Sequence, residues 1–199
     1  MKKNNHRMHG TRLVVTNAIA SAMLLVYGRS AYAGTCVETV PASGVWVCSG
    51  AAGADVTQPI IGAPITITTT PGFGLNVAMG NALQLSGSAV TFTDINASNI
   101  YGATYGIFAQ NGFAGSLNIS SNGTIGGGNI GIFAQNTNNN NGSIVINTSG
   151  TVTGNGNAGI YAHNSFGTSD LSITTADVMG NQYGIRARSE GYTGAMTIN

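Results

Sequence analysis

A six-residue motif returns four times in the second half of this chain, at nearly constant intervals. It reads Gly-Ile-Phe-Ala-Gln-Asn in its first two copies, and its four copies occupy residues 106–111, 131–136, 159–164 and 184–189. Successive copies are separated by 25, 28 and 25 residues. A period of this length is typical of stacked folds, in which each unit buries its apolar side chains only against its neighbours. The repeat therefore predicts a solenoid.

Two further short segments follow the motif and complete the repeating unit. The first lies at residues 116–120, 143–147, 170–174 and 195–199, and the second at 123–126, 150–153 and 176–179. Apolar residues at every second position between Gly-, Asn- and Ser-rich turns indicate strands. No segment after residue 33 sustains an apolar period of 3.6 residues, which argues against helices. We expect an all-β fold, a parallel β-helix with three strands in each coil.

A degenerate coil before the first full copy sets the length of the predicted stack. Its three strands are expected at residues 74–77, at 83–85 or 90–92, and at 99–102. In this interpretation Gly-Leu-Asn-Val at 74–77 stands where the motif stands later. The sequence then predicts about five coils over residues 71–199, the last one incomplete. Residues 34–70 hold three of the four prolines and the single Trp, and we expect them to cap the first coil.

The fourth copy of the motif indicates which of its side chains face outward. Arg186 takes the place that aromatic residues hold in the other copies, and an unpaired Arg would be costly in a narrow apolar interior. Because side chains alternate along a strand, the Ile and Ala positions are expected to point inward. The outward side chains then form two columns: an aromatic column of Phe108, Phe133 and Tyr161 that ends in Arg186, and a polar column of Gln110, Gln135, His163 and Arg188.

An asparagine column of Asn111, Asn136 and Asn164 occupies the last position of the motif. At a repeated turn, amide side chains can hydrogen-bond to the coils above and below and satisfy backbone groups there. The alternative is a polar ligand site. Since the position repeats in phase with the fold, we favour the structural role.

The first 33 residues have the three parts of a secretory signal peptide. Four basic residues precede residue 13, an apolar stretch runs from residue 13 to 26, and Ala31-Tyr-Ala33 has the small-x-small pattern of a cleavage site. The alternative is a membrane anchor, but fourteen residues that include Thr16 and Asn17 are short and polar for a span. We expect export through the inner membrane and cleavage after Ala33.

The remaining chain contains one pair of cysteines, Cys36 and Cys48. In an oxidising compartment, a close and even pair indicates a disulfide. Metal ligation or a reactive thiol is the alternative, but neither a second Cys pair nor a neighbouring His supports it. We expect a Cys36–Cys48 disulfide in the cap.

The charge of the predicted mature chain excludes one large class of partners. Five of the seven basic residues lie within residues 1–33, and all six acidic residues lie after it, so the net charge becomes 2 − 6 = −4. Arg186 and Arg188 are the only basic side chains left. Two cations cannot neutralise a row of phosphates, and nucleic-acid binding is therefore not expected.

Signals for catalysis are weak. His163 is the only histidine after the predicted signal peptide, and it stands where Gln110 and Gln135 stand in sister coils, which favours a surface role over a Ser–His–Asp site. The acidic residues are dispersed rather than clustered as calcium binding or glycoside hydrolysis would require. We expect no enzyme activity, no metal and no cofactor. The alternative is a fragment of a β-helical carbohydrate-active enzyme, a polysaccharide lyase or hydrolase.

The order of these features resembles the passenger domain of Gram-negative autotransporters, the type V secreted proteins. The matching pieces are the long signal peptide, Gly-Val-Trp-Val-Cys-Ser-Gly at 44–50, Pro-Gly-Phe-Gly-Leu at 71–75, Gly-Asn-Ala at 80–82, and the coils rich in Gly, Asn, Ser and Thr that follow. The resemblance implies a right-handed β-helix, a place at the cell surface or in the medium, and a part in adhesion, aggregation or virulence. It also implies an outer-membrane β-barrel translocator. The chain stops at Asn199 inside a coil without such a barrel, so we expect a truncated product or fragment, or a separate partner for export.

These expectations combine into a non-enzymatic, adhesin-like interaction protein. Exposed aromatic side chains in register with hydrogen-bonding side chains suit a host-cell or matrix surface, whether glycan or protein. The candidate interaction surface is the aromatic column with Arg186 and the polar column. The alternative, which we favour, is that both columns only stabilise the sheet by stacking, or lie beneath the variable turns between the coils.

Overall fold

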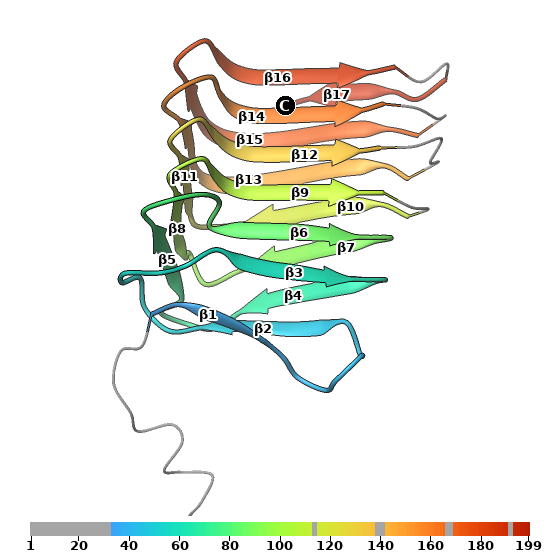
Figure 1. The fold of residues 1–199 in the computed structure, drawn as a ribbon. Helices are drawn as coiled ribbons and strands as arrows, with labels where there is room; N and C mark the ends of the chain where they lie inside the picture. The colour runs from blue at the N-terminus through green and yellow to red at the C-terminus, as the bar shows by residue number, and fades with distance from the viewer. Residues whose placement is uncertain (1–32, 113–114, 138–141, 166–168, 191–192) are drawn as a thin grey trace, which may run out of the picture. The chain divides into compact units, whose positions relative to one another are not determined.

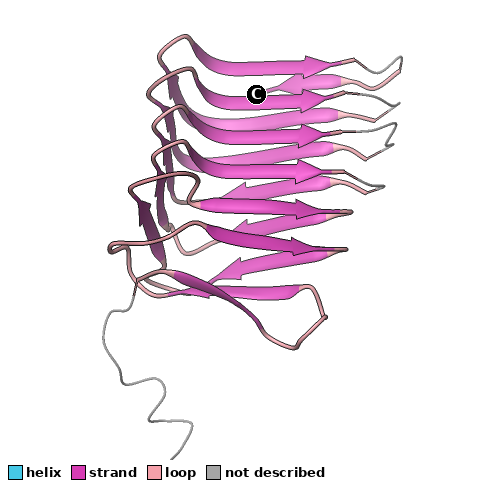
Figure 2. Ribbon diagram, viewed as in Figure 1, coloured by secondary structure: helices cyan, strands magenta, loops and turns pink. Residues whose placement is uncertain are grey.

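A computed structural model describes residues 33–112, 115–137, 142–165, 169–190 and 193–199. Residues 32–199 form one compact unit. The predicted signal peptide therefore lies outside the described residues, apart from Ala33. All regular structure in the described ranges is β-strand, and no helix there is long and apolar enough to cross a membrane (Figure 2).

One wall of the stack is a six-stranded sheet that receives one strand from each turn (Figure 1). Its strands, in stacking order, are β3 (Gln58–Gly62), β6 (Leu83–Gly87), β9 (Tyr105–Asn111), β12 (Ile130–Asn136), β14 (Ala158–Asn164) and β16 (Tyr183–Ser189). All neighbours in this sheet are parallel. The motif supplies the last four of these strands, as the sequence predicts.

The second and third strands of each turn belong to an eleven-stranded sheet. Its second strands are β4 (Ile65–Thr69), β7 (Val90–Asp94), β10 (Leu117–Ser121), β13 (Ile144–Gly154), β15 (Leu171–Gly180) and β17 (Met196–Ile198). The third strands are β5 (Gly74–Val77), β8 (Asn99–Gly102) and β11 (Thr124–Gly127). In β13 and β15 the second and third strands run together, with a register shift between Thr148 and Thr151 that preserves the bend.

The stack contains about six turns rather than the five expected, because parallel pairing begins before residue 71. β3 pairs with β6 and β4 pairs with β7, so residues 58–69 already form a coil. The alignment of the degenerate coil is also corrected. Gly74–Val77 is a third strand, paired with β8, whereas Leu83 and Leu85 stand opposite Ile107 and Ala109 of the motif. Apolar residues at every second position occur in both segments, so alternation alone could not assign them.

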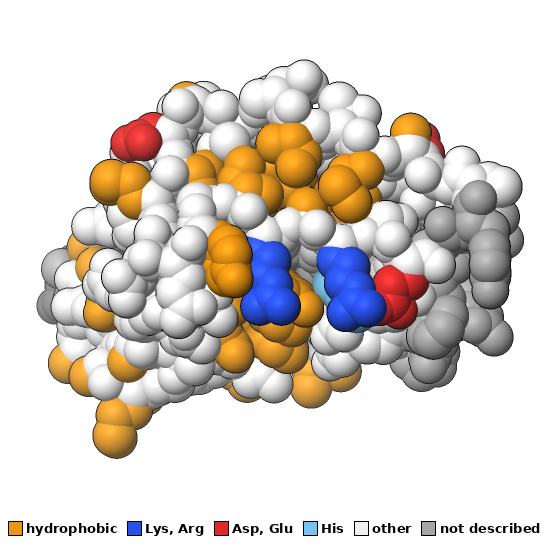
Figure 3. All heavy atoms as spheres, turned by 90° about the horizontal axis from the view of Figure 1, so that it is seen from above, with side chains coloured by type: hydrophobic (Ala, Val, Ile, Leu, Met, Phe, Trp, Pro, Cys, Tyr) orange, Lys and Arg blue, Asp and Glu red, His pale blue; other side chains and the backbone are white. Residues whose placement is uncertain are grey.

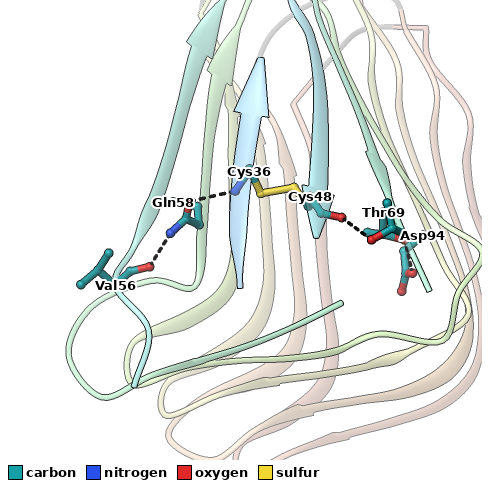
Figure 4. Close-up of a disulfide and its surroundings, with 7 residues drawn as sticks. Cys36, Cys48, Val56, Gln58, Thr69 and Asp94 are labelled. Atoms are coloured by element: carbon teal, nitrogen blue, oxygen red, sulfur yellow. Dashed lines mark hydrogen bonds between the residues drawn. A yellow bond between two sulfur atoms is a disulfide. The ribbon is translucent and has the colours of Figure 1, made fainter. Parts of the chain in front are cut away.

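The first strands of the chain close the lower end of the stack as a hairpin. β1 (Thr35–Glu38) pairs antiparallel with β2 (Val45–Ser49), and β2 pairs in parallel with β4. Cys36 and Cys48 stand opposite each other in the hairpin and are joined by the expected disulfide (Figure 4). The backbone amide of Cys36 also donates to the Gln58 side-chain carbonyl at 3.1 Å, which ties the hairpin to β3 (Figure 4).

The interior is a continuous set of aliphatic side chains from every strand of the motif. Ile107, Ile132 and Ile160 are fully buried, as are Ala109, Ala134 and Ala162 two residues further along each strand. The inward orientation of the Ile and Ala positions is confirmed for these three coils. Ile185 and Ala187 in the last coil are only partly buried, although they pack against the same core.

The glycine that opens the motif is required by the close approach of neighbouring backbones. A Cβ atom on Gly131 would lie 2.7 Å from the carbonyl oxygens of Gly159 and Thr153. Carbon and oxygen do not approach that closely without displacement of one of the strands. The repeat therefore keeps glycine where the strand enters the sheet at the corner.

The asparagine column is buried, with each side chain at most 1% exposed. The side-chain amides of Asn111, Asn136 and Asn164 donate to the carbonyl oxygens of Gly115, Gly142 and Ser169, respectively. Each acceptor ends the turn that follows in the same coil. One bond joins two coils, from Asn136 Nδ2 to Asn164 Oδ1 at 3.5 Å. The column is thus structural, as expected, but it mainly fastens the turn within each coil instead of linking coil to coil.

Candidate functional site

The outward side chains of the six-stranded sheet form the two columns that the sequence predicts. Strand register places Phe108, Phe133, Tyr161 and Arg186 in one line and Gln110, Gln135, His163 and Arg188 in the other. Neighbouring strands lie about 4.8 Å apart, so each column adds one side chain per strand spacing. These residues are intermediate in exposure on β9, β12 and β14, and exposed on β16. The two columns therefore reach the surface on one continuous face, although the side chain of His163 is only 13% exposed.

The rings of the aromatic column lie flat against one another. The ring centroids of Phe108 and Phe133 are 5.0 Å apart at 7° between planes, and those of Phe133 and Tyr161 are 5.0 Å apart at 5°. Tyr105 packs beside the first two rings, with centroids 5.6 and 5.5 Å away. Since the ring faces contact each other, the rings stabilise the sheet and present mainly their edges outward.

Arg186 caps this column at the β16 end. Its guanidinium carbon lies 5.4 Å from the ring centroid of Tyr161 and 5.5 Å from that of Tyr183, within the range of cation–π attraction. No ion pair joins Arg186 to a carboxylate among the described residues. Two tyrosine rings thus hold an exposed guanidinium whose charge is not neutralised by an acidic side chain.

The polar column ends in a small charged cluster. Gln135 Nε2 lies 3.3 Å from His163 Nδ1, and Glu190 Oε1 lies 2.6 Å from Arg188 Nη2. His163 Nε2 lies 3.4 Å from the same Glu190 oxygen. This nitrogen is buried, and its contact with Glu190 does not have the geometry of a hydrogen bond. We therefore regard Arg188 as the partner of Glu190 and His163 as a neighbour of the pair.

Ser165 brings a hydroxyl near the same histidine. Its Oγ is 3.4 Å from His163 Nδ1, so a serine, a histidine and a carboxylate meet at this point. An assembled nucleophile needs short, aligned bonds from serine to base and from base to carboxylate. Here Ser165 is only 7% exposed, and Gln135 contacts the same Nδ1 atom. The arrangement does not have the geometry of a working triad.

Charge is segregated between the two sheets. The strands of the six-stranded sheet contain Arg186 and Arg188 and no acidic residue, whereas those of the eleven-stranded sheet contain Glu38, Asp94 and Asp177 and no basic residue. Figure 3 shows the two basic side chains of the described residues side by side on the end of the stack, with an acidic side chain next to one of them. Positive charge is therefore gathered on one face.

Asp94 belongs to a polar cluster in the interior and not to the surface. It is 1% exposed and accepts hydrogen bonds from the hydroxyls of Thr69, Ser98 and Ser121 at 2.7, 2.8 and 2.9 Å. Burial acts to raise the pKa of this carboxyl, but the bonds from Thr69, Ser98 and Ser121 outweigh it and hold the pKa below its usual value. The cluster stabilises a corner where three coils meet.

Glu38 lines a hollow at the lower end of the stack, beside the turns that follow β1 and β3. Its two carboxylate oxygens accept hydrogen bonds from the backbone amides of Ala42 and Gly44 at 3.1 and 2.8 Å. The carboxylate therefore shapes its own turn and is not directed at a ligand. Across the described ranges, no three His, Cys, Asp or Glu side chains gather closely enough to hold a metal ion.

Eight of the residues on this face were predicted from the sequence, and four others that shape it were not. Tyr105 and Tyr183 lie outside the motif positions that alternation placed on the outer face. Glu190 and Ser165 follow the ends of strands, and only the bend of the chain brings them to His163. Comparison with protein-family models, with curated proteins and with solved structures finds no match to this chain.

Proposed function

We propose that this protein is a non-enzymatic, adhesin-like interaction protein of the bacterial cell surface, a passenger segment of a type V autotransporter. It is exported through the inner membrane and works at the cell surface or in the medium. An outer-membrane β-barrel translocator is its partner in export. A host-cell or matrix surface, glycan or protein, is its partner in adhesion.

One observation carries the proposal: the outer face of the six-stranded sheet presents an aromatic side chain and a polar side chain in register on each of β9, β12 and β14. The side chains of Gln110, Gln135 and His163 follow one another in register. The amides of Gln110 and Gln135 offer both donors and acceptors, His163 packs against Gln135, and the flat aromatic column beside them holds the face rigid. A rigid row of equivalent groups suits an extended partner, because several weak contacts then act together.

The test compares this face with the outer face of the other sheet. Gln110, Gln135 and His163 are replaced together by alanine in the full-length chain. The matched control replaces Ser120, Asn147 and Thr174, which are also in register and outward-facing but lie on β10, β13 and β15. Both variants are purified, checked for β-structure and thermal unfolding, and measured for retention on cultured host cells and on immobilised matrix.

We expect the polar-column variant to remain folded and to lose at least about tenfold in retention, and the control variant to retain as the unaltered chain does. Equal losses in the two folded variants would mean that retention is unspecific. Retention that is unchanged when the polar column is removed would refute the role of this face.

A further inference from the structure

We infer that the β16 end of this face binds an anionic group of its partner, and that the partner is an acidic polysaccharide carrying carboxylates. The inference rests on the proposed function and names the ligand class of the same surface. The anion-binding group is the guanidinium of Arg186, held between Tyr161 and Tyr183. Arg188 is a second cation on the same strand, and Glu190 neutralises its charge.

The first observation is the position of the two basic side chains. Every basic side chain after residue 33 lies on one strand, β16, two residues apart and facing outward. Glu190 forms an ion pair with Arg188, with 2.6 Å between Oε1 and Nη2. Arg186 has no carboxylate within salt-bridge distance among the described residues. A planar guanidinium in this state can receive a carboxylate with two parallel hydrogen bonds.

The second observation is that two tyrosine rings contact the Arg186 side chain. Centroid distances of 5.4 and 5.5 Å place both rings within cation–π range of the Arg186 guanidinium, which limits the motion of an otherwise exposed side chain. A cation that is already positioned loses less conformational entropy when an anion binds. The site is therefore more ordered than a surface arginine without such contacts.

The polar column, which runs beside the aromatic column that Arg186 caps, indicates what kind of molecule bears the anion. A peptide could add to this end of the sheet only along the open edge of β16, because β9, β12 and β14 are paired on both sides, and it would then run along that strand and not across the strands along the polar column. What the face offers along that line instead are the side-chain amides of Gln110 and Gln135, which are both donors and acceptors. Saccharide hydroxyls are also both, so a chain of uronic acid residues can bond along the polar column and place a carboxylate on Arg186, which lies beside the end of that column.

The experiment measures binding of the full-length chain to a defined oligogalacturonate and to its fully methyl-esterified form, which lacks the negative charges. Three variants are compared: Arg186→Gln, Arg188→Gln and Glu190→Gln. All three positions lie on the surface of the last coil, and thermal unfolding is checked for each. An oligoglutamate peptide is the competing acidic ligand.

We expect the unaltered chain to bind the acidic oligosaccharide, more weakly as salt increases, and to bind the methyl ester and the peptide at least about tenfold less tightly. Arg186→Gln lowers the association constant about tenfold or more, since it removes a charged bidentate contact. Arg188→Gln lowers it less. Glu190→Gln raises it, by up to about fivefold, because Arg188 is released from a surface ion pair.

Several results would overturn the inference: equal binding of the acid and its ester, equal binding of the peptide, no binding of the acid, or an Arg186→Gln chain that is folded and binds fully. A folded Glu190→Gln chain with weaker binding would also contradict it. If oligogalacturonate does not bind but retention on cells still depends on the polar column, only the ligand class is wrong. If both fail, the proposed function fails.

Discussion

Gln135 and Asn136 are consecutive residues of β12, both with side-chain amides and both repeated in neighbouring coils, yet their surroundings differ in kind. Asn136 is fully buried, and its Nδ2 donates to Gly142 O at 2.6 Å. Gln135 is partly exposed, and within the described residues its Nε2 meets only His163 Nδ1, at 3.3 Å. The asparagine column and the polar column differ in burial in the same way. Repetition alone therefore does not tell a structural side chain from one that is available to a partner.

The difference follows from the two faces of one strand. A buried amide NH2 group without an acceptor costs about 1–3 kcal/mol, and the Nδ2 of Asn136 finds its acceptors in Gly142 O and Asn164 Oδ1. An outward amide has water as a partner and is held only weakly by its neighbours. Inner positions of this sheet thus contribute stability, and outer positions are left for recognition. Substitutions on the two faces should therefore have different effects.

The largest effect is expected in the aliphatic interior. Ile132→Ala removes a fully buried side chain and should lower the free energy of unfolding by about 2–5 kcal/mol. Val145→Ala, on the outer face of β13, is the matched aliphatic control and should change it by about 0.5 kcal/mol or less. Chemical denaturation of both variants measures the difference. Similar losses at the two positions would contradict the inner and outer assignment.

The hairpin at the lower end is stabilised in a different way from the coils. Replacement of Cys36 and Cys48 by serine opens a crosslink between residues 12 apart in sequence and should cost about 3 kcal/mol. Hydrogen exchange should then increase in β1 and β2, while β12 and β14 stay protected. The control is the unaltered chain under reducing conditions, which should behave in the same way. Uniform loss of protection along the stack would show that the end and the coils do not open separately.

The interior polar cluster gives a smaller effect with a distinct pH dependence. Asp94→Asn replaces an acceptor of five side-chain and backbone hydrogen bonds by a group with two donors, and should cost about 1–3 kcal/mol at neutral pH. Because the pKa of Asp94 is lowered in the folded state, its contribution is present above its unfolded pKa and is lost as the pH falls through the folded pKa. Denaturation from pH 7 to pH 2 should therefore show the variant and the unaltered chain converging below about pH 4.

The control for this series is Asp177→Asn. Asp177 is exposed on β15, where its carboxylate accepts a single bond from Thr151 at 3.3 Å. The stability of this variant should follow that of the unaltered chain within about 0.5 kcal/mol at every pH. An Asp94→Asn chain that keeps a constant deficit down to pH 2 would mean that Asp94 is not the titrating group.

Much of the solenoid is predictable from the sequence because three coils repeat the same residues at the same places. The inward Ile and Ala positions and the two outer columns follow from alternation together with the exceptional Arg186. The first coil was missed because residues 58–69 carry Pro59 and Pro64 and no copy of the motif. Its pairing depends on apolar positions that many β-proteins share.

The parts of the site that were missed share a physical reason. The interior cluster joins Thr69, Asp94 and Ser121, three different residues whose equivalence appears only in the strand register. Glu190 lies beyond the last position of the motif, and its distance to Arg188 depends on how the chain bends after β16. A repeat predicts which side chains recur, but not which neighbours the turns bring to them.

The most direct test of the division between the two faces is the adjacent pair Gln135→Ala and Asn136→Ala, measured side by side for stability and for retention on host cells or matrix. We expect Asn136→Ala to lower the free energy of unfolding by about 1–3 kcal/mol, since the turn is left unfastened, and its folded fraction to be retained normally. Gln135→Ala should change stability by about 0.5 kcal/mol or less and should weaken retention. A Gln135→Ala chain that is destabilised as much as Asn136→Ala, or that is retained like the unaltered chain, would contradict the account.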